Sequence, residues 1–321
     1  MATVRPFRFG TGMIPVQGGA DLVSHARKVE ALGYSTLATG EHLSLGGIGP
    51  VASIMAVAAA TSSLRIASAM FANDFRHPVL LAQEAATIDL LSNGRLEFGI
   101  GGGWLRTDYV AAGLSFDPPA MRIARLEEAV ALIKQLFGEE PVTFAGDFYR
   151  VDGLNLQPKP RQRPHPPFFI GGGGRRVLTL AAREATIVGL DPKGTAAGTK
   201  DAATMTAEVV DHLVSWVREA AGPRFSDLEL HTNILALKIA DDRRQGRDEI
   251  AAMFASLPPW MVSNALADEQ ILNSPYVLIG SIDQIVEDLQ ARRERYGISY
   301  VTVPGEFVDA FSPVVARLAG T

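Results

Sequence analysis

Residues 167–176 have the sequence PFFIGGGGRR, which joins a short apolar run, four glycines and the start of an amphipathic helix. The same order, a β-rich run followed by a glycine or polar loop and then a helix, recurs along the chain. It is typical of parallel strands connected by crossover helices. The β-rich runs lie at 7–13, 35–40, 64–72, 96–101, 167–171, 185–190, 228–237 and 299–303. Eight such strands predict a closed (β/α)₈ barrel, the TIM barrel fold.

The alternative architecture is a doubly wound open sheet, which usually has fewer strands and a glycine fingerprint directly after its first strand. Residues 9–12, FGTG, lack the third spaced glycine of that fingerprint. We therefore predict one barrel domain over residues 1–321. Two segments depart from its repeat: a hairpin at about 142–151, and a long segment at about 246–278 that we expect to form a lid-like insertion over the C-terminal ends of the strands.

The composition excludes several classes of protein. The chain has 321 residues, of which 47% are hydrophobic and 20% charged, so it carries enough apolar material for a large core. Its net charge of −5 argues against nucleic-acid binding, and the absence of cysteine excludes disulfides and thiolate ligands. No histidines show metal-ligand spacing, so we predict no metal site. We expect a cytoplasmic protein, because residues 1–10 contain no apolar signal segment.

Residues 43–64 carry no charge and are long enough to raise the question of a membrane span. Gly46, Gly47, Gly49 and Pro50 interrupt this stretch. They leave a helix of about twelve residues, which suits a barrel wall better than a bilayer. We therefore predict no membrane span.

Catalytic and binding residues of a barrel lie at the C-terminal ends of its strands, so the residues after each run are the candidates. Glu41 and His42 follow the second run, and we predict that this acid and imidazole act in proton transfer. The alternative is a loop pair that caps the next helix.

Gly102, Gly103 and Trp104 follow the fourth run, where glycines allow close approach of a planar ligand and the indole can form a wall. The alternative there is a tight turn with a buried tryptophan.

The loop after the fifth run combines exposed backbone N–H groups, a helix N-terminus and two guanidinium groups, which together can bind a phosphate. It matches neither a Walker loop nor a spaced dinucleotide fingerprint. The alternative is a solvated arginine pair beside a flexible turn. The residues of this predicted anion site are Gly171, Gly172, Gly173, Gly174, Arg175 and Arg176.

His231 lies within the seventh run, where alternation could direct its side chain into the barrel. A catalytic role is one interpretation of that position. Buried polar groups are normally hydrogen-bonded, so we predict a core histidine with a partner.

Further motifs are distributed along most of the chain. They are Gly40-Glu41-His42, Asn93-Gly94-Arg95 before FGIG at 98–101, Gly103-Trp104, and LQPKP at 156–160 before PPFFIGGG at 166–173. Together they resemble the luciferase-like flavin and deazaflavin oxidoreductases, especially the actinobacterial branch of coenzyme F420-dependent oxidoreductases. The resemblance runs along most of the chain.

The resemblance implies that the ring of coenzyme F420, or alternatively of FMN, lies across the strand ends near His42 and Trp104. F420-dependent relatives carry an Asp-His pair after the second strand. Here Glu41 stands at the acid position, so the implied role of positioning or protonating the reacting centre falls on His42. A non-prolyl cis peptide is typical of relatives and would fall at Ala69-Met70, beside the ring. The cofactor phosphate would lie on residues 171–176.

The predicted function is that of an F420-dependent oxidoreductase, which transfers a hydride between the deazaflavin and a small organic substrate. One alternative is an FMN-dependent monooxygenase that uses reduced flavin and O₂, and another is a barrel that only binds a flavin-like ligand.

Residues 258–275, with Trp260 and Met261, suggest an apolar roof over the substrate. The lysines that hold the phosphate in relatives acting on a sugar phosphate are not matched. Relatives are often dimers, so a homodimer is implied as well.

Overall fold

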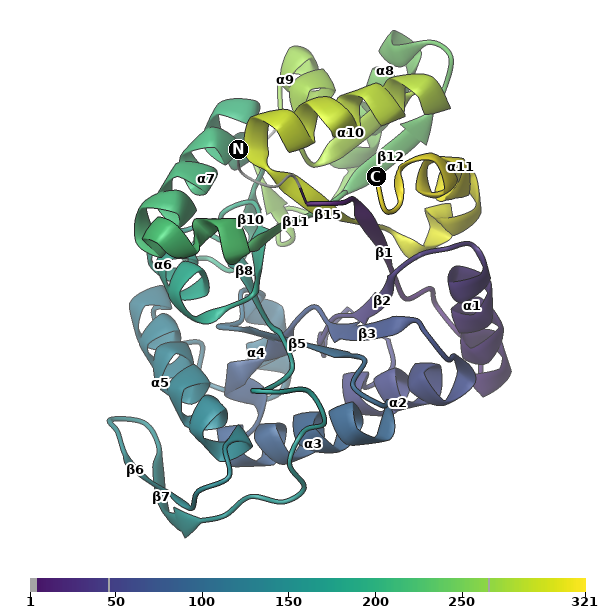
Figure 1. Cartoon of the computed structure of the whole chain (residues 1–321). Helices are drawn as coiled ribbons and strands as arrows, with labels where there is room; N and C mark the ends of the chain where they lie inside the picture. The colour runs from purple at the N-terminus through teal and green to yellow at the C-terminus, as the bar shows by residue number, and fades with distance from the viewer. Residues whose placement is uncertain (1–4, 46, 265) are drawn as a thin grey trace.

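Parallel strands form a closed ring in the computed structural model, which describes residues 5–45, 47–264 and 266–321 (Figure 1). Pairing of β3 with β5 and of β15 with β1 closes the ring. The predicted (β/α)₈ barrel is therefore confirmed. In hydrogen-bonded order its eight strands are β1 (Arg8–Gly12), β2 (Thr36–Thr39), β3 (Arg65–Ser68), β5 (Leu96–Gly101), β8 (Phe168–Gly172), β9 (Ile187–Leu190), β11 (Glu229–Asn233) and β15 (Ile298–Val303).

Helices surround the ring of strands (Figure 1). Every residue of β2, β9 and β15 is buried, because side chains fill the barrel on one face of each strand and helices cover the other. This explains why these strands appear in the sequence as continuous apolar runs. The outer helices are α1 (Gly19–Ala31), α2 (Pro50–Ala60), α3 (Pro78–Leu91), α5 (Pro119–Phe137), α6 (Arg175–Glu184), α7 (Ala207–Ala221), α10 (Ile282–Tyr296) and α11 (Val308–Leu318).

The ends of several helices follow from local sequence. Ser281 and Gln284 form the predicted capping box of α10, and Gly297 ends that helix in the left-handed conformation with φ 77°. Pro78 lies in the first turn of α3, where the missing N–H costs nothing. At the chain ends, the N–H of Phe7 donates to the carbonyl of Thr321 at 3.0 Å, so both ends of the barrel chain meet at one place.

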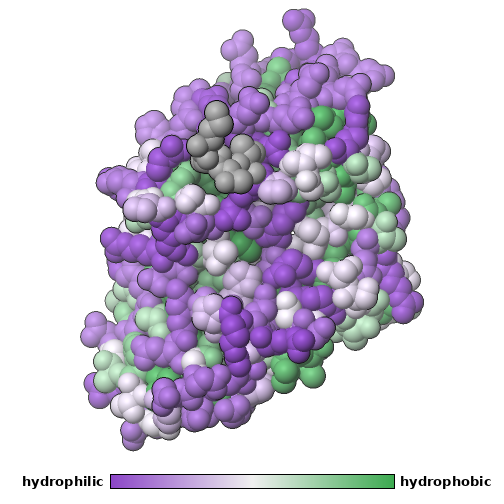
Figure 2. Space-filling view, in the orientation of Figure 1, coloured by the Kyte–Doolittle hydropathy of each residue, from purple (hydrophilic) through white to green (hydrophobic). Residues whose placement is uncertain are grey.

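The uncharged stretch at 43–64 contains α2, which has only 11 residues. Across 5–45, 47–264 and 266–321, no helix is both long and apolar enough to cross a membrane. Gly46, one of the predicted interruptions, lies outside the described residues. On the face drawn in Figure 2, hydrophilic side chains predominate and the apolar areas are small and separated.

The predicted hairpin is present as β6 (Val142–Ala145) and β7 (Arg150–Leu154), which pair antiparallel outside the barrel. The predicted strand at 64–72 is divided into β3 and the short β4 (Phe71–Ala72). The bond between them, Ala69-Met70, is the non-prolyl cis peptide that the resemblance implied.

The predicted seventh strand at 228–237 is wrong in its extent, because it covers two strands. Barrel strand β11 ends at Asn233, and β12 (Ala236–Ile239) pairs with β14 (Val277–Gly280) outside the ring. The N–H of Ile234 still donates to Thr302 of β15, whereas the next N–H, of Leu235, donates to Tyr276. The chain therefore changes partner within one residue, directly after Asn233, in a run that contains neither glycine nor proline.

The excursion between β12 and β14 is longer than the predicted insertion at 246–278. It contains α8 (Arg243–Ser256), β13 (Val262–Ser263) and α9 (Asp268–Asn273), and β13 pairs with β10 (Lys200–Asp201). Apolar side chains of α8 and α9 form a small core together with those of β12 and β14, made of Ala236, Ile250, Ile271, Val277 and Ile279. This core holds the excursion as a packed unit beside the barrel.

Buried charges close the barrel at the N-terminal ends of its strands. Arg8 forms two hydrogen bonds of 2.6 Å with Glu229 and a 2.7 Å ion pair with Glu97. Glu97, 1% exposed, also accepts from Arg65 at 2.6 Å and lies beside the Tyr300 hydroxyl. Burial alone would lower the pKa of Arg8, but Glu97, Tyr300 and Glu229 outweigh it and raise that pKa. A charge without its partner in this place would be costly.

His231 occupies the interior between this charged floor and the other end of the barrel. Its Nε2 lies 2.9 Å from Thr302 Oγ1, and its ring packs edge-on against Phe169 and Tyr300. Burial, with a smaller contribution from the charge of Arg8, lowers the pKa of His231 to about 3. The prediction of a hydrogen-bonded core histidine is confirmed.

The Glu97→Gln substitution should lower the free energy of unfolding by about 3 kcal/mol, because Arg65 would lose its carboxylate partner and Arg8 one of its two, in a largely buried place. Chemical denaturation followed by circular dichroism measures this value. Asp309→Asn is the matched control, since it removes an ion pair with Lys28 whose side chains are 49% and 65% exposed. It should change the free energy of unfolding by less than about 0.5 kcal/mol. Equal effects of the two substitutions would contradict a floor held by buried charge.

The low pKa of His231 should make stability depend on pH. The unfolded chain takes up a proton near pH 6.5, whereas the folded chain keeps this imidazole neutral down to about pH 3. Unfolding therefore becomes easier as the pH falls below about 6.5. Between pH 6.5 and 5 the wild type should lose about 1.5 kcal/mol more than His231→Gln, as measured by urea denaturation. Parallel pH profiles for the two proteins would show that the prediction is wrong.

Candidate active site

A cavity of about 680 Å³ opens at the C-terminal ends of the barrel strands. It lies between the loops that follow β2, β3, β5, β8, β9 and β11, and apolar side chains line most of it. The predicted site residues that line it are Glu41, His42, Ala69, Met70, Gly102, Gly103, Trp104, Gly171, Gly172, Gly173 and Gly174. The barrel thus brings predicted residues from four separate strand ends into one place.

His42 is held in the cavity wall by an acid that is distant in sequence. Its Nδ1 lies 2.7 Å from Oδ2 of Asp108, which belongs to α4 (Arg106–Ala111). The other oxygen, Oδ1, accepts hydrogen bonds from the N–H groups of Leu43 and Ser44 at 2.9 and 2.7 Å, and from the Ser44 hydroxyl at 2.7 Å. Burial alone would raise the pKa of Asp108, but the hydrogen bonds from Ser44 and His42 outweigh it and lower that pKa. Asp108 is therefore ionised at neutral pH.

Trp104 lies beside His42 and forms the adjoining wall. The two rings meet edge to face, with centroids 5.7 Å apart. The Lys200 ammonium also lies over the indole ring, 5.1 Å from its centroid. These two contacts hold Trp104 as an apolar surface of the cavity.

The predicted acid Glu41 has other partners. Its Oε2 accepts from the N–H of Ala72 at 2.9 Å, and its Oε1 forms an ion pair with Arg76. Glu41 therefore joins the loop after β2 to the segment after β3. The acid that contacts His42 is Asp108, which the sequence did not single out.

The glycine loop after β8 forms the opposite part of the cavity. Gly174 is the N-cap residue of α6, and no side chain caps the first turn of this helix. Its free N–H groups and the helix dipole therefore favour an anion at the cavity edge. Gly173 also meets a steric need, since a Cβ there would lie 2.5 Å from the backbone of both Asp191 and Lys193.

The sequence predicts that Arg175 and Arg176 complete this anion site, but in the structure neither arginine lines the cavity. Arg175 pairs with Glu219 at 2.9 Å, and Arg176 pairs with Glu127 at 2.6 Å. Both guanidinium groups lie outside the cavity, on the outer surface of α6. Their charges are compensated there by carboxylates of neighbouring helices, so only the glycines and the helix terminus face the cavity.

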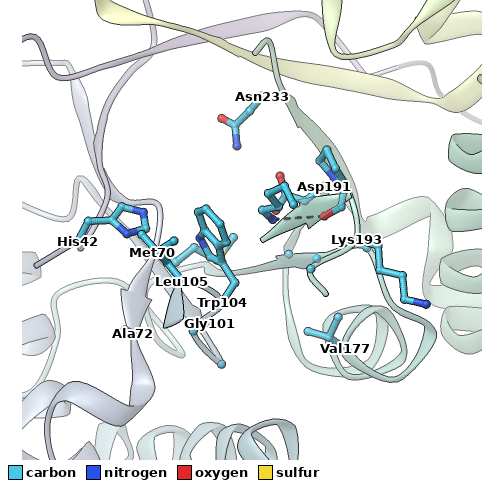
Figure 3. Close-up of a pocket in the computed structure, with 18 of the residues that line it drawn as sticks. His42, Met70, Ala72, Gly101, Trp104, Leu105, Val177, Asp191, Lys193 and Asn233 are labelled. Carbon is cyan, nitrogen blue, oxygen red and sulfur yellow. Dashed lines mark hydrogen bonds between the residues drawn. The ribbon is translucent and has the colours of Figure 1, made fainter. Parts of the chain in front are cut away.

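Polar residues that the sequence did not single out also face the cavity. Asp191 follows β9 and Asn233 ends β11, and Figure 3 shows them across the cavity from His42. Lys200 lies nearby, with its ammonium donating to the carbonyl of Pro192 at 3.3 Å. The side chain of Lys193 points away from Trp104 (Figure 3). The residue directly after the sixth run is Asp191, so the strand-end rule contained the signal for it.

The excursion after β12 covers one side of the cavity with apolar side chains. Met253, Phe254 and Leu257 come from the end of α8, and Met261 and Val262 from the segment that follows. Met261 belongs to the predicted roof, whereas the α8 residues precede it. Trp260 is 43% exposed and does not line the cavity.

Comparison with known proteins identifies relatives of two kinds. Residues 1–300 match the family model described as luciferase-like monooxygenase. The FMNH₂-dependent dimethylsulfone monooxygenase of Pseudomonas putida is 35% identical over 128 residues, or 40% of this chain and 35% of that protein. An F420-dependent glucose-6-phosphate dehydrogenase of Amycolatopsis mediterranei is 32% identical over 173 residues, or 52% of this chain and 51% of that protein. The chain thus aligns with about a third to a half of the length of these curated relatives.

Among solved structures, the coenzyme F420-dependent tetrahydromethanopterin reductase from Methanopyrus kandleri superposes with a TM-score of 0.77. The superposition covers 98% of this chain and 100% of that one, at 15% sequence identity. At this identity the likeness concerns the fold alone.

The Gly173→Ala substitution should lower the free energy of unfolding by about 1–3 kcal/mol, because its Cβ would overlap backbone atoms that cannot move aside cheaply. Gly174→Ala is the matched control, since no atom lies within 4 Å of a Cβ there. Its loss of a favourable N-cap residue and its gain in chain stiffness should offset each other to within about 0.5 kcal/mol. Thermal and urea denaturation of both variants measure the difference. If the control loses as much stability as Gly173→Ala, close packing of this loop is not the reason.

Proposed function

Since the chain belongs to the luciferase-like monooxygenase family, we propose that it is a coenzyme F420-dependent oxidoreductase acting on a small organic substrate. The observation that carries this proposal is His42, held by the buried carboxylate of Asp108 in the wall of an apolar cavity at the strand ends. When bound, the deazaflavin supplies the ring that accepts or donates a hydride, and the protein supplies orientation and electrostatics.

The cavity fits a flat ring with an anionic tail. Its volume of about 680 Å³ lies within the usual range of ligand sites, about 300–1,000 Å³. Trp104 and Met70 offer apolar surface for a ring, and Gly101 to Gly103 leave backbone uncovered beside it. The uncapped first turn of α6 suits the phosphate that both F420 and FMN carry.

The side chains of the cavity suggest how the protein would take part. His42 would hold or move a proton at the nitrogen that faces the cavity. The roof from Met253 to Val262 would exclude water from the reacting atoms. Glu41 would keep the loop after β2 in place through its ion pair with Arg76 and its hydrogen bond from the N–H of Ala72, and so would support the position of His42.

The apolar roof supports a largely apolar substrate. Met253, Phe254, Leu257, Met261 and Val262 present no charge to the cavity. A sugar phosphate would need cations directed at its phosphate, as charged groups recognise phosphate in proteins. Lys193 and Lys200 both line the cavity, but the Lys193 side chain points away from Trp104 (Figure 3), and the Lys200 ammonium lies over the indole of Trp104. We therefore propose a substrate other than a sugar phosphate.

The choice of F420 over FMN rests on the extent of the likeness. The shared segment is longer with the F420-dependent dehydrogenase, 173 residues against 128. The dimethylsulfone monooxygenase has the slightly higher identity over its shorter segment, and it supports a second candidate function, an FMN-dependent monooxygenase using reduced flavin and O₂.

Titration of the purified protein with oxidised F420 and with FMN, followed by coenzyme fluorescence, tests the proposal. F420 should bind with a dissociation constant in the micromolar range, which corresponds to a binding free energy on the order of −8 kcal/mol. FMN should bind at least about tenfold more weakly. Trp104→Ala should weaken F420 binding about three- to tenfold, because it removes an aromatic wall. Arg175→Ala is the control and should leave binding unchanged, since this guanidinium is paired with Glu219 outside the cavity. Binding of FMN alone would overturn the choice of coenzyme, and a large effect of Arg175→Ala would restore the arginine to the anion site.

A further inference from the structure

Only one of the two ring nitrogens of His42 has a partner among the described residues. Nδ1 lies 2.7 Å from Asp108 Oδ2, whereas Nε2 has no hydrogen-bond partner there. The imidazole is 28% exposed and lines the cavity (Figure 3). We propose that Asp108 is a positioning residue: it keeps the proton of neutral His42 on Nδ1 and so presents Nε2 to the cavity as a proton acceptor. The catalytic meaning of this inference rests on the proposed function, but the position of the proton does not.

The surroundings of Asp108 determine which way the hydrogen bond runs. Three donors converge on Oδ1, namely the N–H groups of Leu43 and Ser44 and the Ser44 hydroxyl. These donors fix the carboxylate in one orientation and leave Oδ2 for the imidazole. An ionised carboxylate can only accept hydrogen bonds, so Nδ1 must be the donor. Neutral imidazole carries one proton, and with that proton on Nδ1 the lone pair is on Nε2.

No other acid in the described cavity wall is available for this role. Glu41, the chain neighbour of His42, is engaged by Arg76 and by the N–H of Ala72. Asp191 lies across the cavity from His42 (Figure 3). Asp108, 66 positions along the chain from His42, is the one that makes contact.

The same carboxylate couples two walls of the cavity. Asp108 belongs to α4, which begins at Arg106, shortly after Trp104. Its bonds to Leu43 and Ser44 therefore tie the loop that carries Trp104 to the loop that carries His42. The edge-to-face contact of these two rings, at 5.7 Å, follows from that tie. Asp108 thus fixes both the orientation of the imidazole and its distance from the indole.

The Asp108→Asn substitution tests the direction of the hydrogen bond. The amide oxygen should stay with the donors of Leu43 and Ser44, which require an acceptor. The amide NH₂ would then point at Nδ1 and act as a donor, which should move the proton of neutral His42 to Nε2. Long-range ¹H–¹⁵N correlation spectra of protein labelled with ¹⁵N-histidine report the protonated nitrogen directly. They are recorded at alkaline pH, where imidazole is neutral, and His42→Gln identifies the signals.

The wild type should show the Nδ1–H form, and Asp108→Asn the Nε2–H form. Ser44→Ala is the control, because it removes one donor to Oδ1 and leaves the carboxylate in place, so the Nδ1–H form should remain. An Nε2–H signal in the wild type, or an Nδ1–H signal in Asp108→Asn, would overturn the inference. If Asp108→Asn does not fold, the wild-type and Ser44→Ala spectra still decide it.

Coenzyme titration of the same samples separates this inference from the proposed function. Asp108→Asn should retain F420 binding within about threefold, because the amide keeps the size of the carboxylate and Asp108 is neither an apolar wall nor part of the anion site. A wild type that binds neither F420 nor FMN contradicts the proposed function and leaves the spectroscopic result standing. A wild type that binds F420 but carries the proton on Nε2 contradicts the role of Asp108 alone.

Discussion

Closure of the parallel ring is the constraint on which the remaining structure depends. All eight strands run in the same direction around the ring that the pairing of β3 with β5 completes, so their C-terminal ends meet on one face. His42, Trp104, Gly173 and Asn233, far apart in sequence, come together there because each follows or ends a strand. The loops differ in length and chemistry, but their starting points are fixed by the ring.

The two ends of the barrel treat charge in different ways. At the N-terminal end, Arg8, Arg65, Glu97 and Glu229 neutralise one another in buried ion pairs that require no ligand. At the C-terminal end, polar groups remain available: the uncapped turn of α6 offers N–H groups, and the imidazole of His42 faces the cavity. The N-terminal ends of the strands, where the charges are paired, therefore contribute to stability, whereas the C-terminal ends, where polar groups stay unpaired, can bind a ligand. This division is common in barrels of this kind.

The sequence predicted the parts of the site that lie directly after a strand. Glu41, His42 and Trp104 were found because each follows an apolar run, and the cis peptide at Ala69-Met70 was found by resemblance. Asn233 was missed because the seventh run was extended to 237, which hid the strand end inside it. The arginines were misplaced for a different reason: the sequence does not tell which side of a helix terminus faces the cavity, and Glu127 and Glu219 of neighbouring helices bind them outside.

Asp108 shows why a site of this kind exceeds what sequence adjacency can predict. Glu41 is next to His42 in the chain, but successive residues of a loop point in different directions, and Arg76 takes its carboxylate. The acid that holds the imidazole comes from α4, a helix of only six residues after another strand. Because β2 and β5 both pair with β3, the loops that follow them start on the same face of the barrel, one strand apart. The chemistry of His42 therefore depends on strand pairing between segments distant in sequence, which the local motif around His42 does not encode.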